Sequence, residues 1–194
     1  IRDLVSTDVA LKVDEGLLLG TDVYPELNSV AAVASTFAAG SYATSVQAPT
    51  LVDLIQVGSC QISDAGLNNK FSANVALLNP ADKCLMTLEK DANNNYLIPN
   101  WITSDGMNIG AVRIMTNSLI PVDEMYIMDS TKGTVVSRRG TTVEFGFENN
   151  DNFEKELVTV KAYERLNFLV RNVDANAFMH VPSIAAGITA ITKP

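Results

Sequence analysis

The chain has 194 residues, of which 47% are hydrophobic and 19% charged, and its formal net charge is −8. This composition excludes intrinsic disorder as the main state, and the length suits one large domain or two small ones. Fourteen basic residues against 22 acidic ones leave no surplus for a broad basic face, which excludes a dedicated nucleic-acid reader. No apolar run approaches the length of a membrane span, so we expect no membrane partner.

The first predicted element is a helix over residues 2–19. Leu4, Leu11 and Leu18 repeat at intervals of seven, and valines between them widen the apolar surface. We therefore expect this helix to be covered on much of its circumference, and Gly20 to end it as a left-handed cap. Because the chain begins with Ile1 and enters this pattern directly, we also expect a fragment that lacks its N-terminal part.

A second helix is predicted from Thr50, where Asp53 completes a capping box. Its inward residues at helical spacing are Leu51, Leu54, Ile55 and Ile62. The two cysteines, Cys60 and Cys84, are too few for a disulfide framework or a zinc site. Both lie on apolar helical stretches, which predicts buried free thiols.

The stretch from Val75 to Leu97 predicts a strand, a capped helix, a polar turn and a second extended segment. Residues 75–78 are a short apolar run typical of a buried strand. Asn79 can cap the following helix, Pro80 fits its first position, and Asp82 adds negative charge at the positive end of the helix dipole. The predicted inward residues of this helix are Leu85, Met86 and Leu88.

From Gly110 the apolar pattern changes to a period of two, which predicts short strands broken by Pro121, Gly133 and Gly140. A polar turn follows at 148–152, and the alternation at 157–164 predicts another strand. Residues 175–181 are expected to be extended as well.

Four motifs, in this order along the chain, resemble the major capsid proteins of tailed bacteriophages. They are Leu18-Leu19-Gly20, the N-P-x-D helix start at 79–82, Asp151-Asn152-Phe153 and Glu164-Arg165-Leu166. The resemblance implies an α+β fold of two lobes. Residues 1–36 and 131–171 would form a peripheral lobe with a long spine helix and long strands. Residues 37–130 and 172–194 would form an axial lobe with a mixed sheet flanked by helices.

The function implied by the resemblance is structural. The chain would be a subunit of an icosahedral phage or prophage capsid, assembling into hexamers and pentamers around double-stranded DNA in the bacterial cytoplasm and remaining in the virion. Its partners would be copies of itself, DNA bound non-specifically, and scaffold, portal and protease proteins. Two alternatives remain open: an encapsulin-type nanocompartment shell, and a small acidic soluble enzyme.

The candidate inter-subunit contacts are the clustered basic pair Arg138 and Arg139, and Glu164 and Arg165 within the predicted C-terminal strand. Arginine can hold a carboxylate of a neighbouring chain through two parallel hydrogen bonds. The alternative interpretation of the arginine pair is a solvated turn before Gly140.

No residue pattern predicts catalysis, a metal site or a cofactor. The single histidine, His180, lies in an apolar context that favours a structural role, and Ser183 lacks the Gly-x-Ser-x-Gly elbow of serine hydrolases. Asp91-x-Asn93-x-Asn95 imitates the start of a calcium loop. However, Tyr96 stands where the loop needs glycine, and Ile102 where it needs a bidentate glutamate.

Some relatives of this family join a lysine to an asparagine of a neighbouring subunit. Glu156 occupies the position that matches this asparagine, and Tyr163 the position that matches the assisting glutamate. A carboxylate does not release ammonia as an amide does, so we expect no covalent cross-link.

Overall fold

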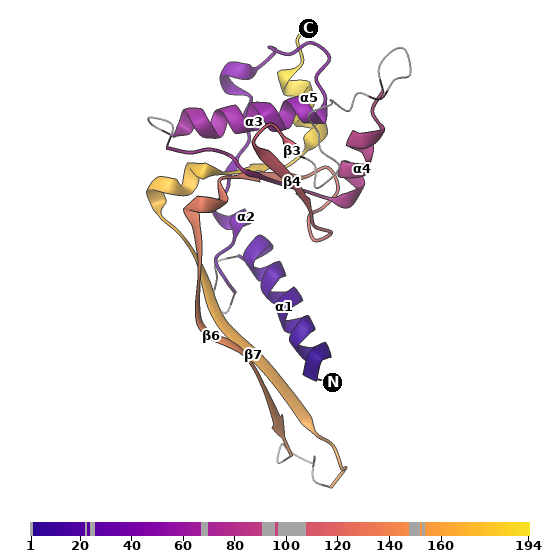
Figure 1. The fold of residues 1–194 in the computed structure, drawn as a ribbon, viewed down its shortest axis with the longest axis vertical. Coiled ribbons are helices and arrows are strands. Elements are labelled where there is room, and N and C mark those ends of the chain that lie inside the picture. The colour runs from indigo at the N-terminus through magenta and orange to yellow at the C-terminus, as the bar shows by residue number, and fades with distance from the viewer. Residues whose placement is uncertain are drawn as a thin grey trace. The chain divides into compact units, whose positions relative to one another are not determined.

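The computed structural model divides the chain into two compact units (Figure 1). Unit 1 contains Ile1–Ala32 and Thr134–Leu169, and unit 2 contains Val33–Gly133 and Val170–Pro194. The structure describes residues 2–21, 23, 26–66, 70–90, 96, 108–147, 152 and 154–194. Each unit is built from segments that lie far apart in the sequence.

Helix α1 (Arg2–Leu19) forms the N-terminal part of unit 1. Leu18 is buried, but Leu4 and Leu11 are 68% and 59% exposed. The expectation that α1 is covered on much of its circumference is therefore wrong for the described part of the chain. Leu18 lies at the end where the chain turns back past Gly20, whereas the first turns of the helix have no such cover.

Gly20 ends α1, but not as a left-handed cap, because positive φ among the described glycines occurs at Gly40 and Gly110. Its smallness is needed for a different reason. A Cβ at Gly20 would lie 2.4 Å from the carbonyl oxygen of Leu27 and 2.5 Å from that of Gly16. The helix end and the returning segment thus approach each other through their backbones.

Strands β6 (Gly133–Gly146) and β7 (Thr159–Val170) form a two-stranded sheet, which we call the ribbon. The predicted break at Gly140 is wrong, since β6 continues through it. Glycine weakens a strand without ending it, and pairing with β7 holds the backbone extended. Arg138 and Arg139 consequently lie within a strand and not in a turn.

Unit 2 contains a six-stranded sheet in the order β1-β8-β5-β2-β4-β3. Its strands are β1 (Ser35–Thr36), β2 (Val75–Leu78), β3 (Asn108–Ile109), β4 (Val112–Thr116), β5 (Met125–Met128) and β8 (Phe178–Val181). The sheet is mixed: β1 runs parallel to β8 and β2 parallel to β4, while the other neighbours are antiparallel. All four residues of β5 are buried, as suits a central strand.

The remaining elements are α2 (Val30–Val33), α3 (Leu51–Ala65), α4 (Pro80–Leu88), α5 (Ile184–Ile191) and the 3-10 helices η1 (Gly40–Tyr42), η2 (Ser130–Lys132) and η3 (Asn172–Ala177). The Asp53 carboxylate accepts hydrogen bonds from the backbone N–H and the hydroxyl of Thr50, where α3 begins. A Cβ at Gly58 would lie 2.4 Å from Ile127 Cδ1, so the α3 backbone lies directly on β5. Among the described residues, no helix is long and apolar enough to cross a bilayer.

Two expectations about apolar helix faces need correction. In α4 only Met86 of the three expected residues is buried, while Leu85 and Leu88 are exposed. The inward positions are Asp82 and Met86, four residues apart, and this spacing turns Leu85 away. Cys84 is also exposed, and Cys60 is half-buried, so the prediction of two buried thiols is wrong.

Helix α4 is tied to the segment before β5 through its first residues. Asn79 precedes the helix; its Oδ1 accepts from the Ala81 N–H at 2.9 Å, and its Nδ2 donates to the Ile120 carbonyl at 2.7 Å. Asp82 is buried and accepts from the Asp123 N–H at 2.9 Å. Pro80 occupies the first helical turn, where its missing N–H removes no helical hydrogen bond.

The segment 175–181 is only partly extended, because η3 precedes β8. Asp174, fully buried in η3, explains the helical turn. Its carboxylate lies 2.8 Å from Lys70 Nζ and 2.6 Å from the Arg171 guanidinium, and a helical turn brings Arg171 and Asp174 to one side. The hydrogen bond from Lys70, and then that from Arg171, lowers the pKa of Asp174.

Asp174 should make the stability of the protein depend on acid pH. Because its pKa is lowered in the folded protein, Asp174 contributes fully to the unfolding free energy at pH values above its unfolded-state pKa of about 3.9. This contribution is lost as the pH falls through the pKa of the folded state. We expect the difference in unfolding free energy between wild type and Asp174→Asn to be largest above about pH 4 and to shrink on acidification. Urea unfolding across pH measures this, with the exposed Asp14→Asn as control. A difference that stays constant with pH would contradict it.

Asn79→Ala should lower the urea midpoint without changing the slope. The variant loses both the cap and the bond to Ile120, at a cost of about 1–3 kcal/mol. Asn79→Asp keeps the capping acceptor but loses the donor, so it should fall between wild type and Asn79→Ala. An unchanged midpoint for Asn79→Ala would show that this cap does not stabilise α4.

Candidate inter-subunit surface

The four candidate contact residues all lie on the ribbon of unit 1. Arg138 and Arg139 are exposed and adjacent in β6, and Glu164 and Arg165 are adjacent in β7. Because successive side chains of a strand point to opposite faces, each pair presents one charge on either face. The structure therefore places basic groups on both faces of the ribbon.

Tyr163 is the centre of a cross-strand cluster on the ribbon. The Arg139 guanidinium lies 4.8 Å from the centre of its ring, and Lys161 Nζ lies 5.1 Å from it. The Tyr163 hydroxyl donates to Glu144 Oε1 at 2.7 Å, and this bond raises the pKa of Tyr163. The tyrosine thus holds two cations and one carboxylate together across the two strands.

Glu164 is held within the ribbon as well. Its Oε2 accepts a hydrogen bond from the Thr141 hydroxyl at 2.8 Å. Of the four candidate residues, the structure thus links Arg139 and Glu164 to partners on the opposite strand. Arg138 and Arg165 form no ion pair with another described residue, and Arg165 is exposed.

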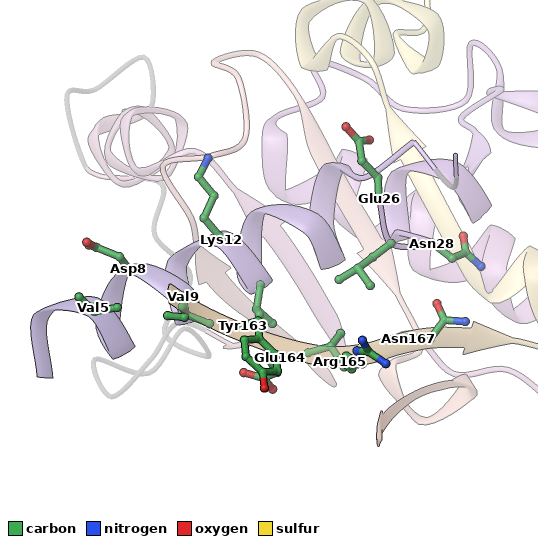
Figure 2. Close-up of a pocket in the computed structure, with 14 residues that line it drawn as sticks. Val5, Asp8, Val9, Lys12, Glu26, Asn28, Tyr163, Glu164, Arg165 and Asn167 are labelled. Atoms are coloured by element: carbon green, nitrogen blue, oxygen red, sulfur yellow. The ribbon is translucent and has the colours of Figure 1, made fainter. Parts of the chain in front are cut away.

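A groove of about 1040 Å³ lies between α1 and β7 within unit 1 (Figure 2). The side chains that line it are Val5, Asp8, Val9, Lys12 and Val13 of α1, Glu26, Leu27 and Asn28 of the returning segment, and residues 162–167 of β7. Its lining mixes valine and leucine with acidic and basic groups. This surface has the character of an interaction surface more than of a small-molecule pocket, which is mostly apolar and enclosed.

The described residues of unit 2 do not assemble a catalytic centre. His180 Nε2 lies 3.1 Å from Glu124 Oε2, and its ring stacks on Tyr126 at 4.5 Å between centroids. Ser183 donates to Asp123 at 2.6 Å and caps α5 by accepting from the Ala186 N–H. No group of three or more His, Cys, Asp or Glu side chains in the described ranges could hold a metal ion. The calcium-like stretch 91–95 lies outside the described residues.

Sequence reasoning missed Asp123, which joins three parts of unit 2. Its φ of 72° is left-handed, its carboxylate accepts from Ser183 Oγ and from the Ala185 N–H, and its own N–H donates to Asp82. The Ser183 bond, more than any other contact, lowers the pKa of Asp123. Its place between Val122 and Glu124 in a Pro-containing loop gives no sequence signal beyond the tolerance of aspartate for turns.

Comparison with solved structures defines the class of protein. The fold matches the capsid of an empty GTA particle (14% identity, TM-score 0.63, covering 93% of this chain and 65% of that chain). It also matches a chain of Microbacterium phage Oxtober96 (20% identity, TM-score 0.65, covering 93% of this chain and 63% of that chain). A third match is a virus-like particle from Pyrococcus furiosus (12% identity, TM-score 0.56, covering 88% of this chain and 63% of that chain). The predicted α+β fold of phage capsid subunits is confirmed.

The chain belongs to the Phage capsid family, whose sequence model matches residues 1–181. The resemblance inferred from the sequence is thus confirmed, and the family and fold are those of a structural capsid protein. The chain spans less than two thirds, 61–65%, of the length of the solved chains it matches. No curated protein matches it.

The cluster around Tyr163 can be tested by titration. Because Glu144 raises the pKa of Tyr163, this tyrosine should ionise above the usual value of about 10. The difference in ultraviolet absorbance between wild type and Tyr163→Phe isolates its titration. Glu144→Gln should move it toward 10, whereas Glu154→Gln, the same charge change at the ribbon turn, should not. Ionisation of Tyr163 at or below pH 10 in the wild type would contradict this arrangement.

Proposed function

We propose that this chain is a subunit of an icosahedral phage or prophage capsid, assembling with copies of itself into hexamers and pentamers around double-stranded DNA. The match to the Phage capsid family over residues 1–181 is the observation that carries this proposal. The capsid fold and the amount of uncovered apolar surface on unit 1 support it.

Unit 1 exposes apolar side chains that a monomer would normally bury. On the ribbon they are Val135, Val136, Phe145, Phe147, Leu157, Val158, Val160 and Leu169, and on α1 they are Leu4 and Leu11. Contiguous exposed apolar surface is characteristic of protein–protein interfaces, and a two-stranded sheet is at best marginally stable by itself. Neighbouring subunits would supply the missing cover.

The two units would correspond to the two lobes of a capsid subunit. Unit 1, with α1 and the ribbon, would be the peripheral lobe, and unit 2, with the six-stranded sheet, the axial lobe around which hexamers and pentamers form. Arg138, Arg139, Glu164 and Arg165 would be lateral contacts of the peripheral lobe. Each contact can be weak, because closed symmetry repeats it throughout the shell.

The other proposed partners follow from the same role. Packaged DNA would be bound only non-specifically, since a chain of net charge −8 offers no extended basic face. Scaffold, portal and protease proteins would take part in assembly, which would occur in the bacterial cytoplasm before the subunit enters the virion. The subunit itself would need no catalytic residue.

Expression of the whole reading frame in bacteria, followed by negative-stain microscopy, tests this function. Closed icosahedral particles would support a shell subunit, and their absence under all assembly conditions would contradict it. Expression alongside the neighbouring phage genes then distinguishes the kind of shell. Particles whose DNA resists nuclease support a capsid, whereas particles filled with a co-expressed enzyme would support the nanocompartment.

We expect shells of this protein to lack covalent cross-links. Glu156 has no ammonia to release, and Tyr163, with its raised pKa, stays protonated at neutral pH and cannot act as a base. Purified shells boiled in detergent and reductant should run as chains of a single length. A ladder of multimers that survives this treatment would show that another residue, such as Asn152, accepts a lysine.

A further inference from the structure

Three basic side chains of unit 2 gather where three separate segments of the chain meet. Lys70 precedes the buried Phe71, Lys132 is the last residue of η2, and Arg171 is the residue before η3. Unit 2 as a whole contains seven basic and ten acidic residues, so this gathering runs against the net charge of the unit. We call Lys70, Lys132 and Arg171 the basic cluster.

Asp174 holds two of these cations side by side. Lys70 Nζ lies 2.8 Å from Asp174 Oδ1, and Arg171 Nη2 lies 2.6 Å from Asp174 Oδ2. The carboxylate is buried, whereas the side chains of Lys70 and Arg171 are 41% and 75% exposed. One carboxylate balances only one of the two positive charges. Each cation also keeps N–H groups that its contact with Asp174 does not use, and these groups are available to an anion from solvent.

The ring of Phe71 brings in the third cation. Lys70 Nζ lies 5.1 Å and Lys132 Nζ 5.9 Å from the ring centre, within the range of cation–π attraction. The ring is a fixed support, because it is 3% exposed and a Cβ at Gly66 would lie 2.7 Å from the Phe71 backbone nitrogen. Lys132 forms no ion pair with another residue that the structure describes.

Asp129 fixes the segments that carry the two lysines. It is buried, and its carboxylate accepts from the Ser72 N–H at 3.0 Å and from the Thr131 N–H and hydroxyl at 3.1 and 2.6 Å. These bonds join the residue after Phe71 to η2. Counted with both aspartates, the basic cluster has a net positive charge, and its supports are ordered before any anion binds. A preorganised site loses less conformational entropy on binding.

We propose that the basic cluster binds phosphate groups of duplex DNA without reading its sequence. The proposal rests on the proposed shell function, which supplies the duplex, and it names the residues that would contact it. DNA carries one negative charge per about 1.7 Å of its axis, so one duplex can present phosphates to several cations at once. Lysine binds phosphate as a point charge and accepts many orientations, which suits contact without a fixed register. The acidic surplus of the unit would confine the contact to this cluster.

Glutamine substitutions in the protein made from the whole reading frame test this contact. The cluster variant carries Lys70→Gln, Lys132→Gln and Arg171→Gln. Glutamine removes the charge but keeps N–H donors for the buried Asp174. Lys132→Gln alone serves as a second variant, because Lys132 makes no ion pair with Asp174 and its removal leaves that carboxylate paired. Circular dichroism and urea unfolding establish that each variant is folded.

The matched control makes the same change of net charge elsewhere in unit 2. It carries Lys90→Gln, Arg113→Gln and Lys193→Gln, all at exposed positions outside the basic cluster. A short fluorescein-labelled duplex is titrated with each protein, at protein concentrations below those that form particles. Fluorescence anisotropy gives the association constant at a series of salt concentrations.

The salt dependence should count the contacts. Each neutralised phosphate contributes about −0.9 to the slope of log K against log salt concentration, so wild type should give roughly −2.7 and Lys132→Gln roughly −1.8. The cluster variant should bind at least about tenfold more weakly than wild type at low salt, with a slope near zero. The control variant should keep the wild-type slope, since it retains all three cations of the cluster.

Three outcomes would overturn the proposal. The first is a wild type that does not bind the duplex at low salt, and the second is a control variant that loses as much affinity as the cluster variant. The third is a polyglutamate chain that displaces the duplex and binds as tightly, which would assign the cluster to protein carboxylates. Negative-stain microscopy separates these results from the shell function: particles that form without duplex binding contradict the DNA contact alone, whereas absent particles contradict the shell.

Discussion

The shortage of apolar cover on unit 1 is the constraint on which the rest of the structure depends. A ribbon of two strands has two faces and two outer edges, and the described part of this chain leaves large apolar side chains exposed along it and along α1. Burial of apolar area is the dominant favourable contribution to both folding and association. In the proposed shell, a unit that cannot complete this burial internally would gain stability when it associates, so its folding and its assembly would be coupled.

Unit 2 buries a hydrophobic core within its own residues. Its six-stranded sheet buries every residue of β5, and α3 approaches that strand so closely that Gly58 has no space for a side chain. Several of its acidic side chains have partners: Asp174 forms ion pairs with Lys70 and Arg171, and Asp82 and Asp123 link α4 to α5. Because Asp82 and Asp174 are buried, loss of either carboxylate would leave the groups that contact it without a partner. Unit 2 thus has a buried core of its own, whereas the large apolar side chains of the ribbon and of the first turns of α1 are exposed in unit 1.

Local signals in the sequence were sufficient where a single residue determines a backbone feature. Asn79 and Pro80 predicted the start of α4, and Thr50 with Asp53 that of α3, because capping depends on residues within one turn. Prediction from the sequence failed where contacts with distant segments determine the local backbone structure. β6 continues through Gly140 because β7 pairs with this strand, and Asp174 of η3 forms an ion pair with Lys70, about a hundred positions away in the sequence. The pattern of α1 predicted an apolar helix that is covered on much of its circumference, whereas Leu4 and Leu11 are exposed in the single chain.

Charge and apolar surface have different roles on the ribbon. An exposed ion pair contributes about 0–1 kcal/mol, so the exposed charges of the ribbon would not by themselves hold two copies together. Such charges would nevertheless favour one arrangement of neighbouring copies over another, since like charges that face each other are unfavourable. In the proposed shell, exposed apolar side chains such as Phe145 and Leu157 would provide the area that makes association favourable, although the hydrophobic effect is not directional. A shell needs contacts that are individually weak and geometrically specific, and exposed charges combined with modest apolar area would provide both properties.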